Sequence, residues 1–211
     1  MKNLLCLFLL TTGLSLYSQV NPTLTKLEAI YKGYLISSEE GHGKKALTYL
    51  DNNSKVFFEL LLNNVWYADS VTIDRLSYTE MFIILLIRQI NTPEQILSFR
   101  PKSFGVYVLS KIGHPGCYVR EGYSLGEFRE ENAKAYARLM FKGYALDPEF
   151  EFTREKGHWK ISLIPFLQYC ETNFLSRLKK ANASEKASAL YMIETFCGKP
   201  VDPNIWKPVK K

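Results

Sequence analysis

Residues 150–163 place the strongest constraint on the fold, because they specify a β-hairpin together with its register. Lys156 and Gly157 give a two-residue turn between two stretches in which apolar and polar side chains alternate. The cross-strand pairs that follow from this turn are Phe150 with Leu163, Phe152 with Ile161, Arg154 with Trp159, Glu151 with Ser162, Thr153 with Lys160 and Glu155 with His158. One face of the hairpin is then apolar with an arginine–tryptophan edge, and the other is polar. Turn chemistry and alternation agree, so the sequence predicts this register.

The residues that precede the hairpin predict mostly helices. Apolar side chains recur at helical spacing from Leu24 to Tyr34, and a short helix is predicted around Ala46 to Leu50. The next helix is capped by Asn53 or Ser54 and runs to about Ala68. Two of its faces are apolar, so we expect much of this helix to be buried.

A capping box marks the start of the central helix. Ser77 and Glu80 have the spacing of this motif, and the residues from Met81 to Ile87 are all apolar. This apolar run is far shorter than the roughly 20 residues that cross a bilayer, so it predicts a buried helix. Residues 92–95 give a second start signal with proline at the first helical position, and residues 103–112 predict another helix.

The pattern changes in the second half of the chain. Residues 135–141 alternate as in a strand, whereas the stripe from Phe166 to Leu178 predicts a helix. Ser184 caps a last helix that ends near Phe196. The predicted fold class is therefore α+β, with a helical N-terminal half packed on a curved antiparallel sheet of about four strands, followed by C-terminal helices. We expect a single domain over residues 19–211, since no linker or repeat divides them.

Residues 1–18 have the three parts of a secretory signal peptide. Lys2 supplies the positive charge, an apolar stretch begins at Leu4, and the small Ser18 precedes Gln19. We expect cleavage between Ser18 and Gln19 and a mature chain in the periplasm or outside the cell. The apolar stretch is short and interrupted, so no membrane span is expected after cleavage.

Charge and cysteine content narrow the functional classes. The formal net charge is +6 at pH 7, and the basic residues are scattered among acidic ones, so no nucleic-acid partner is expected. The basic residues within 207–211 predict a solvated tail. Cys117, Cys170 and Cys197 follow the signal peptide, and this odd number argues against a disulfide framework. A Cys170–Cys197 disulfide and three small buried thiols are the two alternatives.

One string resembles a catalytic motif. Residues 122–126 match the G-x-S-x-G pattern of a nucleophile elbow, with Ser124 as nucleophile, and Asp147 and His158 follow in the order of a hydrolase triad. An elbow needs a buried parallel strand before it, whereas the preceding residues predict helices. A serine hydrolase that uses Ser124, Asp147 and His158 is therefore the alternative hypothesis, and no catalytic residue is assigned. The histidines lack metal-ligand spacing and no nucleotide-binding glycine pattern occurs, so neither a metal nor a cofactor is expected.

Residues 152–163, with the sequence FTREKGHWKISL, resemble the penultimate hairpin of proteins with the NTF2-like (cystatin-like cone) fold. With Arg88 at the end of the apolar helix and the tail segment 205–208, the chain resembles a group of uncharacterised exported bacterial proteins. Its signal, ending in Ser-Gln, is similar to those of Bacteroidetes. The resemblance implies a curved sheet wrapped by helices around a cone that can hold a ligand. It implies no activity, because this fold hosts enzymes and binding modules alike.

We therefore expect an exported, non-enzymatic protein that binds either a small apolar ligand or a protein partner, for example as an immunity-type protein. The aromatic content of 14% and the apolar hairpin face favour a binding role. The ligand-binding residues are not identified. Four residues are of interest for where they lie in the predicted elements, with no chemical role assigned to them: Arg88, Arg154, Trp159 and Trp206. Arg88 ends an apolar helix, so its charge needs a partner or water.

Overall fold

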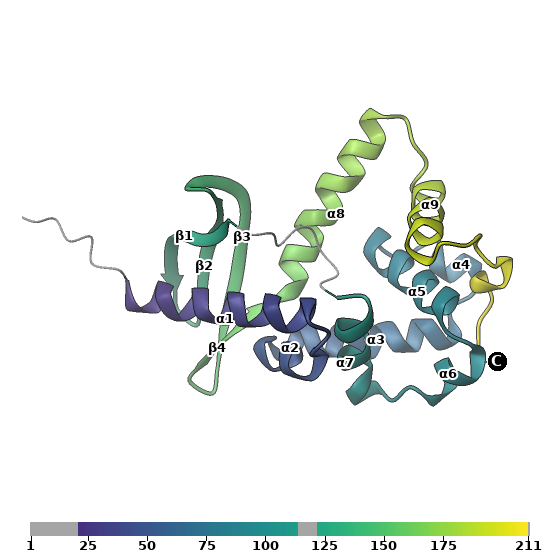
Figure 1. The fold of residues 1–211 in the computed structure, drawn as a ribbon, viewed down its shortest axis with the longest axis horizontal. Helices are drawn as coiled ribbons and strands as arrows, with labels where there is room; N and C mark the ends of the chain where they lie inside the picture. The colour runs from purple at the N-terminus through teal and green to yellow at the C-terminus, as the bar shows by residue number, and fades with distance from the viewer. Residues whose placement is uncertain (1–20, 114–121, 211) are drawn as a thin grey trace, which may run out of the picture.

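The computed structural model of the protein describes residues 21–113 and 122–210. In this part of the chain seven α-helices precede a four-stranded antiparallel sheet, and two α-helices and a short 3-10 helix follow it (Figure 1). The α-helices span Pro22–Glu39 (α1), Gly43–Tyr49 (α2), Asn52–Tyr67 (α3), Ser70–Ile73 (α4), Tyr78–Ile90 (α5), Pro93–Ser98 (α6), Pro101–Lys111 (α7), Leu163–Lys180 (α8) and Glu185–Cys197 (α9). The strands span Tyr123–Glu131 (β1), Lys134–Phe141 (β2), Tyr144–Glu155 (β3) and His158–Ser162 (β4), and the 3-10 helix spans Pro203–Trp206 (η1). The predicted α+β class is confirmed, while the predicted signal peptide, residues 1–18, lies outside the described residues.

The predicted hairpin forms between β3 and β4. Its register is confirmed for five cross-strand pairs, and the guanidinium carbon of Arg154 lies 5.6 Å from the ring centroid of Trp159. Leu163 is the exception, because it begins α8 and does not pair with Phe150. Its backbone N–H donates to the hydroxyl of Ser54 at 2.9 Å, which takes it out of the strand ladder.

Two irregularities curve the sheet, and they explain why β1 and the first half of β3 were not predicted. In β1 the register shifts between Gly126 and Arg129, and Glu127 between them has φ of 44°. In the β2–β3 pair, Arg138 lies opposite Glu149 and Met140 lies opposite Ala145. Three residues of β3, numbers 146–148, therefore stand opposite a single residue of β2. Such bulges bend a strand and break the alternation on which prediction depends.

Helices α1 and α8 pack on one face of the sheet, while most of the other helices lie to one side of it (Figure 1). Phe150 of β3 contacts both α1 and α8. The ring of Tyr31 from α1 meets it edge-on with centroids 4.8 Å apart, and the ring of Phe166 from α8 stacks on it at 4.3 Å. All three side chains are buried. Aromatic contacts of this kind hold α1 and α8 on the same face of the sheet.

Helix α5 is the buried central helix that the sequence predicts. Ser77 accepts a hydrogen bond from the backbone N–H of Glu80, and the Glu80 carboxylate accepts one from the N–H of Ser77 in return. Most of the apolar run that follows is buried. No helix among the described residues is both long and apolar enough to cross a membrane.

Helix α3 differs from the prediction at its start and on its outer face. Asp51, and not Asn53 or Ser54, is the N-cap, and its carboxylate accepts a hydrogen bond from the N–H of Ser54 at 2.8 Å. Val56 and Leu60, which were expected on a buried face, are 49% and 63% exposed. The other apolar residues of both predicted faces are mostly buried, with Phe58, Leu61, Leu62 and Val65 in the core. The first predicted face is therefore divided between core and solvent, a division that sequence periodicity alone does not identify.

Asp51 also joins α3 to the sheet. One carboxylate oxygen accepts a hydrogen bond from the hydroxyl of Ser54, and the other accepts one from the hydroxyl of Ser162 at 2.7 Å. Because the Ser162 proton points to Asp51, the hydroxyl of Thr153 is the donor in its 2.9 Å contact with Ser162. The backbone N–H of Asp51 donates to the carbonyl of Ile161 at 2.9 Å. This buried network connects the start of α3 with β4 and the start of α8.

Arg88 of α5 holds the opposite end of α3. Its Nε donates to the carbonyl of Val65 at 3.0 Å, and its Nη2 donates to those of Asn64 and Ala68 at 3.1 and 2.8 Å. Its Nη1 donates to the carbonyl of Ile205 at 3.0 Å. Burial lowers the pKa of Arg88 to about 10, so the side chain stays charged at neutral pH. Among the described residues no carboxylate pairs with it, and the negative end of the α3 dipole compensates its charge.

Residues 209 and 210 pack on α3, which corrects the expectation of a solvated tail for Lys210, whereas Lys207 is exposed and Lys211 lies outside the described residues. The backbone N–H groups of Val209 and Lys210 both donate to the carbonyl of Trp66 at 2.9 Å. The ammonium of Lys210 lies 3.4 Å from the ring centroid of Trp66, a cation–π contact. Val209 and Lys210 are half-buried and are held against α3 by these contacts.

Replacing Arg88 with alanine is expected to lower the free energy of unfolding by about 3 kcal/mol. The change removes four hydrogen bonds from a charged donor and leaves buried carbonyls without partners. Urea denaturation followed by circular dichroism measures the loss. Arg75→Ala, at an exposed arginine, is the matched control and should stay within about 0.5 kcal/mol of wild type. Equal stabilities for the two variants would show that the Arg88 hydrogen bonds contribute nothing.

Candidate functional site

A pocket of about 510 Å³ lies between the sheet and α8, and we call it the sheet–α8 pocket. Its floor is apolar and consists of Leu139 of β2 and Phe166 at the start of α8. Further apolar residues line its two walls; they are Leu146 and Pro148 of β3 and Phe174 of α8. Leu139 and Phe166 belong to the buried core, so the pocket opens directly onto the packed interface between sheet and helix.

Helix α8 lines one wall of this pocket with a single face. Phe166, Tyr169, Asn173 and Arg177 are spaced three or four residues apart, so they lie one above another along the helix. Cys170 lies beside them on the same wall. This wall changes from apolar near the start of α8 to polar near its end. The end of the wall that carries Asn173 and Arg177 is exposed to solvent.

The bulge in β3 forms the opposite wall. Leu146, Asp147 and Pro148 are consecutive and all line the pocket, which regular strand alternation would not allow. They can do so because these three residues stand opposite Leu139 alone in the β2–β3 pair. Bulges next to functional sites commonly re-aim side chains in this way. Here the bulge brings the carboxylate of Asp147 to the rim of the pocket.

The buried side chain of Tyr31 belongs to the aromatic cluster beneath the pocket floor. Tyr31 is fully buried, and its hydroxyl has no hydrogen-bond partner among the described residues. Its ring contacts Phe150, which stacks on Phe166 of the floor. Burial, with smaller contributions from Tyr123 and Glu39, raises the pKa of Tyr31 far above its usual value. The hydroxyl is therefore neutral at physiological pH. The rings of Tyr31 and Phe150 pack beneath Phe166 of the floor.

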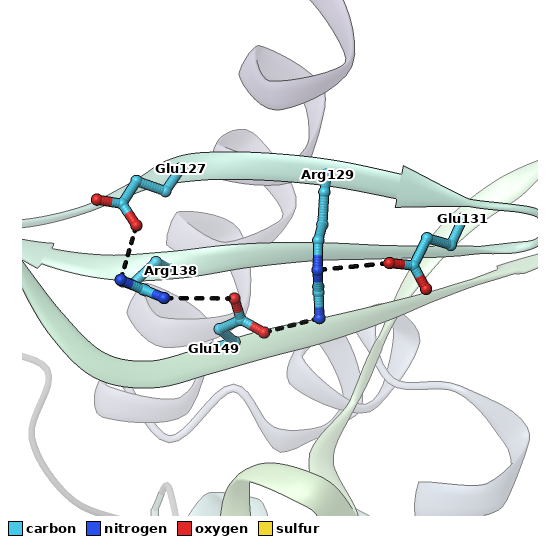
Figure 2. Close-up of polar contacts among 5 residues, drawn as sticks. All are labelled: Glu127, Arg129, Glu131, Arg138 and Glu149. Atoms are coloured by element: carbon cyan, nitrogen blue, oxygen red, sulfur yellow. Dashed lines mark hydrogen bonds and ion pairs between the residues drawn. The ribbon is translucent and has the colours of Figure 1, made fainter.

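The other face of the sheet carries charged side chains that pair with one another. Figure 2 shows this face with the helices behind it. Arg129 lies 2.9 Å from Glu149 and 3.5 Å from Glu131, and Arg138 lies 2.8 Å from Glu127 and 3.9 Å from Glu149. Exposed ion pairs of this kind contribute about 0–1 kcal/mol each. Every charge in this cluster has an opposite neighbour, so we interpret the cluster as a solvated face of the sheet.

The structure does not bring the three residues of the alternative hydrolase triad together. Ser124 lies inside β1, opposite Met140, and not on a strand-to-helix turn. Asp147 is in the bulge of β3, whereas His158 pairs with Glu155 beside the hairpin turn. Asp147 and Glu155 are eight positions apart along β3, which corresponds to roughly 26 Å. Ser124 is at the Asp147 end of the sheet, because its partner Met140 pairs with Ala145. His158 is therefore far from both residues and cannot activate the hydroxyl of Ser124.

Cys170 and Cys197 do not form a disulfide with each other. Cys170 lines the sheet–α8 pocket, and Cys197 is the last residue of α9, where burial raises the pKa of its thiol. Cys117 lies outside the described residues. Within the described ranges, no group of three His, Cys, Asp or Glu side chains is arranged to hold a metal ion.

The residues singled out for their placement have structural roles. Arg88 binds the end of α3, and Arg154 lies over Trp159 on the hairpin. The ring of Trp206 lies 4.1 Å from the ammonium of Lys186, and none of these residues lines the pocket. Sequence reasoning missed the pocket, although polar residues at helical spacing along the apolar stripe 166–178 were a usable signal.

Comparisons with known proteins do not assign this site. No protein-family model matches the chain, and searches of curated proteins and of solved structures found no match either. The resemblance to NTF2-like proteins therefore stays a prediction.

We expect that a fluorophosphonate probe does not label Ser124 in the folded protein, because His158 is at the far end of the hairpin. Intact-mass spectrometry after incubation with the probe measures the adduct, and an established serine hydrolase in the same tube confirms that the probe is active. An adduct that disappears in Ser124→Ala would contradict this expectation and restore the hydrolase hypothesis.

Proposed function

We propose that this is a non-catalytic binding protein whose sheet–α8 pocket holds a small, largely apolar ligand. The observation that carries the proposal is the pocket itself, with its apolar floor and polar rim. Its volume of about 510 Å³ falls within the range of small-molecule sites in proteins.

The chemistry of the pocket lining favours binding over catalysis. Among the described residues that line it, Asp147 is the only acidic one and none is a histidine. A general acid–base mechanism needs a second titratable group within hydrogen-bond reach of the first. Cys170 lines the pocket, and the described lining contains neither a histidine nor a lysine that could lower the pKa of a thiol there.

The proposal includes export, which rests on the three-part pattern of residues 1–18. After cleavage the mature protein would act in the periplasm or outside the cell. The proposed NTF2-like cone agrees with a ligand site between a curved sheet and a helix. The protein-partner alternative, including an immunity-type role, has less support. The exposed apolar side chains on helices α3 and α9 do not line this pocket; they include Val56 and Leu60 on α3 and Tyr191, Met192 and Phe196 on α9.

The test is native mass spectrometry of the mature protein purified from its own host. We expect a small additional mass that is released on denaturation. Asn173→Trp should abolish this mass, because Asn173 is exposed on α8 and lines the pocket, so the indole would fill it. Thr172→Trp is the matched control, since Thr172 is equally exposed on α8 but does not line the pocket. An unbound wild-type protein, or a mass that both variants keep, would contradict the proposal.

A further inference from the structure

The rim of the sheet–α8 pocket carries two opposite charges on facing walls. Asp147 belongs to the bulge of β3, and Arg177 belongs to the polar end of α8. Neither side chain forms an ion pair or a hydrogen bond with any other described residue, and they do not pair with each other. A carboxylate and a guanidinium therefore stand on either side of an apolar floor.

The acidic residues near these two are all engaged. Glu149, two residues along β3, pairs with Arg129 and Arg138 on the other face of the sheet. Glu171, on another face of α8, accepts hydrogen bonds from the backbone N–H groups of Tyr78 and Thr79 at the start of α5. Asp147 differs from both because the bulge turns it away from the paired charges and towards the pocket.

We propose that the ligand of this pocket is a zwitterion with an apolar body, either an apolar amino acid or a short apolar peptide. Its ammonium group binds Asp147, its carboxylate binds Arg177, and its apolar side chain lies on Leu139 and Phe166. A guanidinium binds a carboxylate through two parallel hydrogen bonds, which fits this role for Arg177. This inference rests on the function proposed above.

Ligands with a single charge fit the rim less well. A fatty acid would pair with Arg177, but its carboxylate would face the like charge of Asp147 across the pocket. A cationic amphiphile would have the same conflict with Arg177. Like-charge neighbours of this kind give specificity against the wrong ligand. A zwitterion can pair its ammonium group with Asp147 and its carboxylate with Arg177 at the same time.

The experiment is a titration of the full mature chain with the dipeptide Leu-Phe, its N-acetyl derivative and its C-terminal amide, followed by calorimetry. Acetylation removes the ammonium group and amidation removes the carboxylate. In wild type each modification should weaken binding by about two- to tenfold, the range expected for a partly exposed charge contact. Asp147→Asn should bind the free and acetylated peptides equally and still prefer the free peptide over the amide.

Arg177→Gln should show the converse pattern, with equal binding of the free peptide and the amide. Lys180→Gln, at the exposed end of α8 and outside the pocket lining, is the control and should bind like wild type. Three peptides that bind wild type equally would overturn the inference. Binding of none of them would also overturn it. The proposed function would still stand in either case if the protein from its host carries a mass that Asn173→Trp loses.

Discussion

The buried charge of Arg88 is the interaction on which the helical part of this protein depends. A guanidinium that is 6% exposed would be costly to bury alone, and here four backbone carbonyls surround it. Three of these carbonyls are at the end of α3 and the fourth belongs to Ile205, so α3, α5 and the end of the chain must be in place together. The amide of Gln89 adds two hydrogen bonds, to the carbonyl of Pro200 and from the N–H of Asp202.

Asp51 connects the start of α3 to the sheet, as Arg88 connects its end to α5. The position of the sheet–α8 pocket depends on this connection. The Asp51 network reaches Ser162, the last residue of β4, and Ser54 binds the N–H of Leu163, the first residue of α8. The start of α8 is therefore fixed against the sheet, and this determines which face of the helix meets Leu139 and the β3 bulge. A binding pocket built on two rigid elements held in this way keeps its shape without a ligand.

The sequence predicts the features that short segments specify by themselves. The β3–β4 register follows from the turn at Lys156 and from alternation, and the start of α5 follows from its capping box. The bulges in β1 and β3 were not predictable in this way, because they interrupt the alternation that identifies strands. Val56 and Leu60 of α3 were wrongly expected in the core, because apolar residues surround most of this helix and only tertiary packing decides which of them are buried. The pocket was missed for a similar reason, since Asp147 comes to it through a bulge and was considered only as a triad member.

The β3 bulge links sheet geometry to the proposed chemistry. In a regular strand Asp147 would lie on the same face as Glu149, among side chains that already neutralise one another. The extra residues opposite Leu139 carry it to the face on which α1 and α8 pack, where Arg177 is the complementary charge. Arg177 lies about 21 Å along α8 from the anchored residue Leu163. A ligand that contacts both Asp147 and Arg177 would therefore connect the sheet with the end of α8, far from its anchored start at Leu163. Binding would then change the conformation of this end of α8.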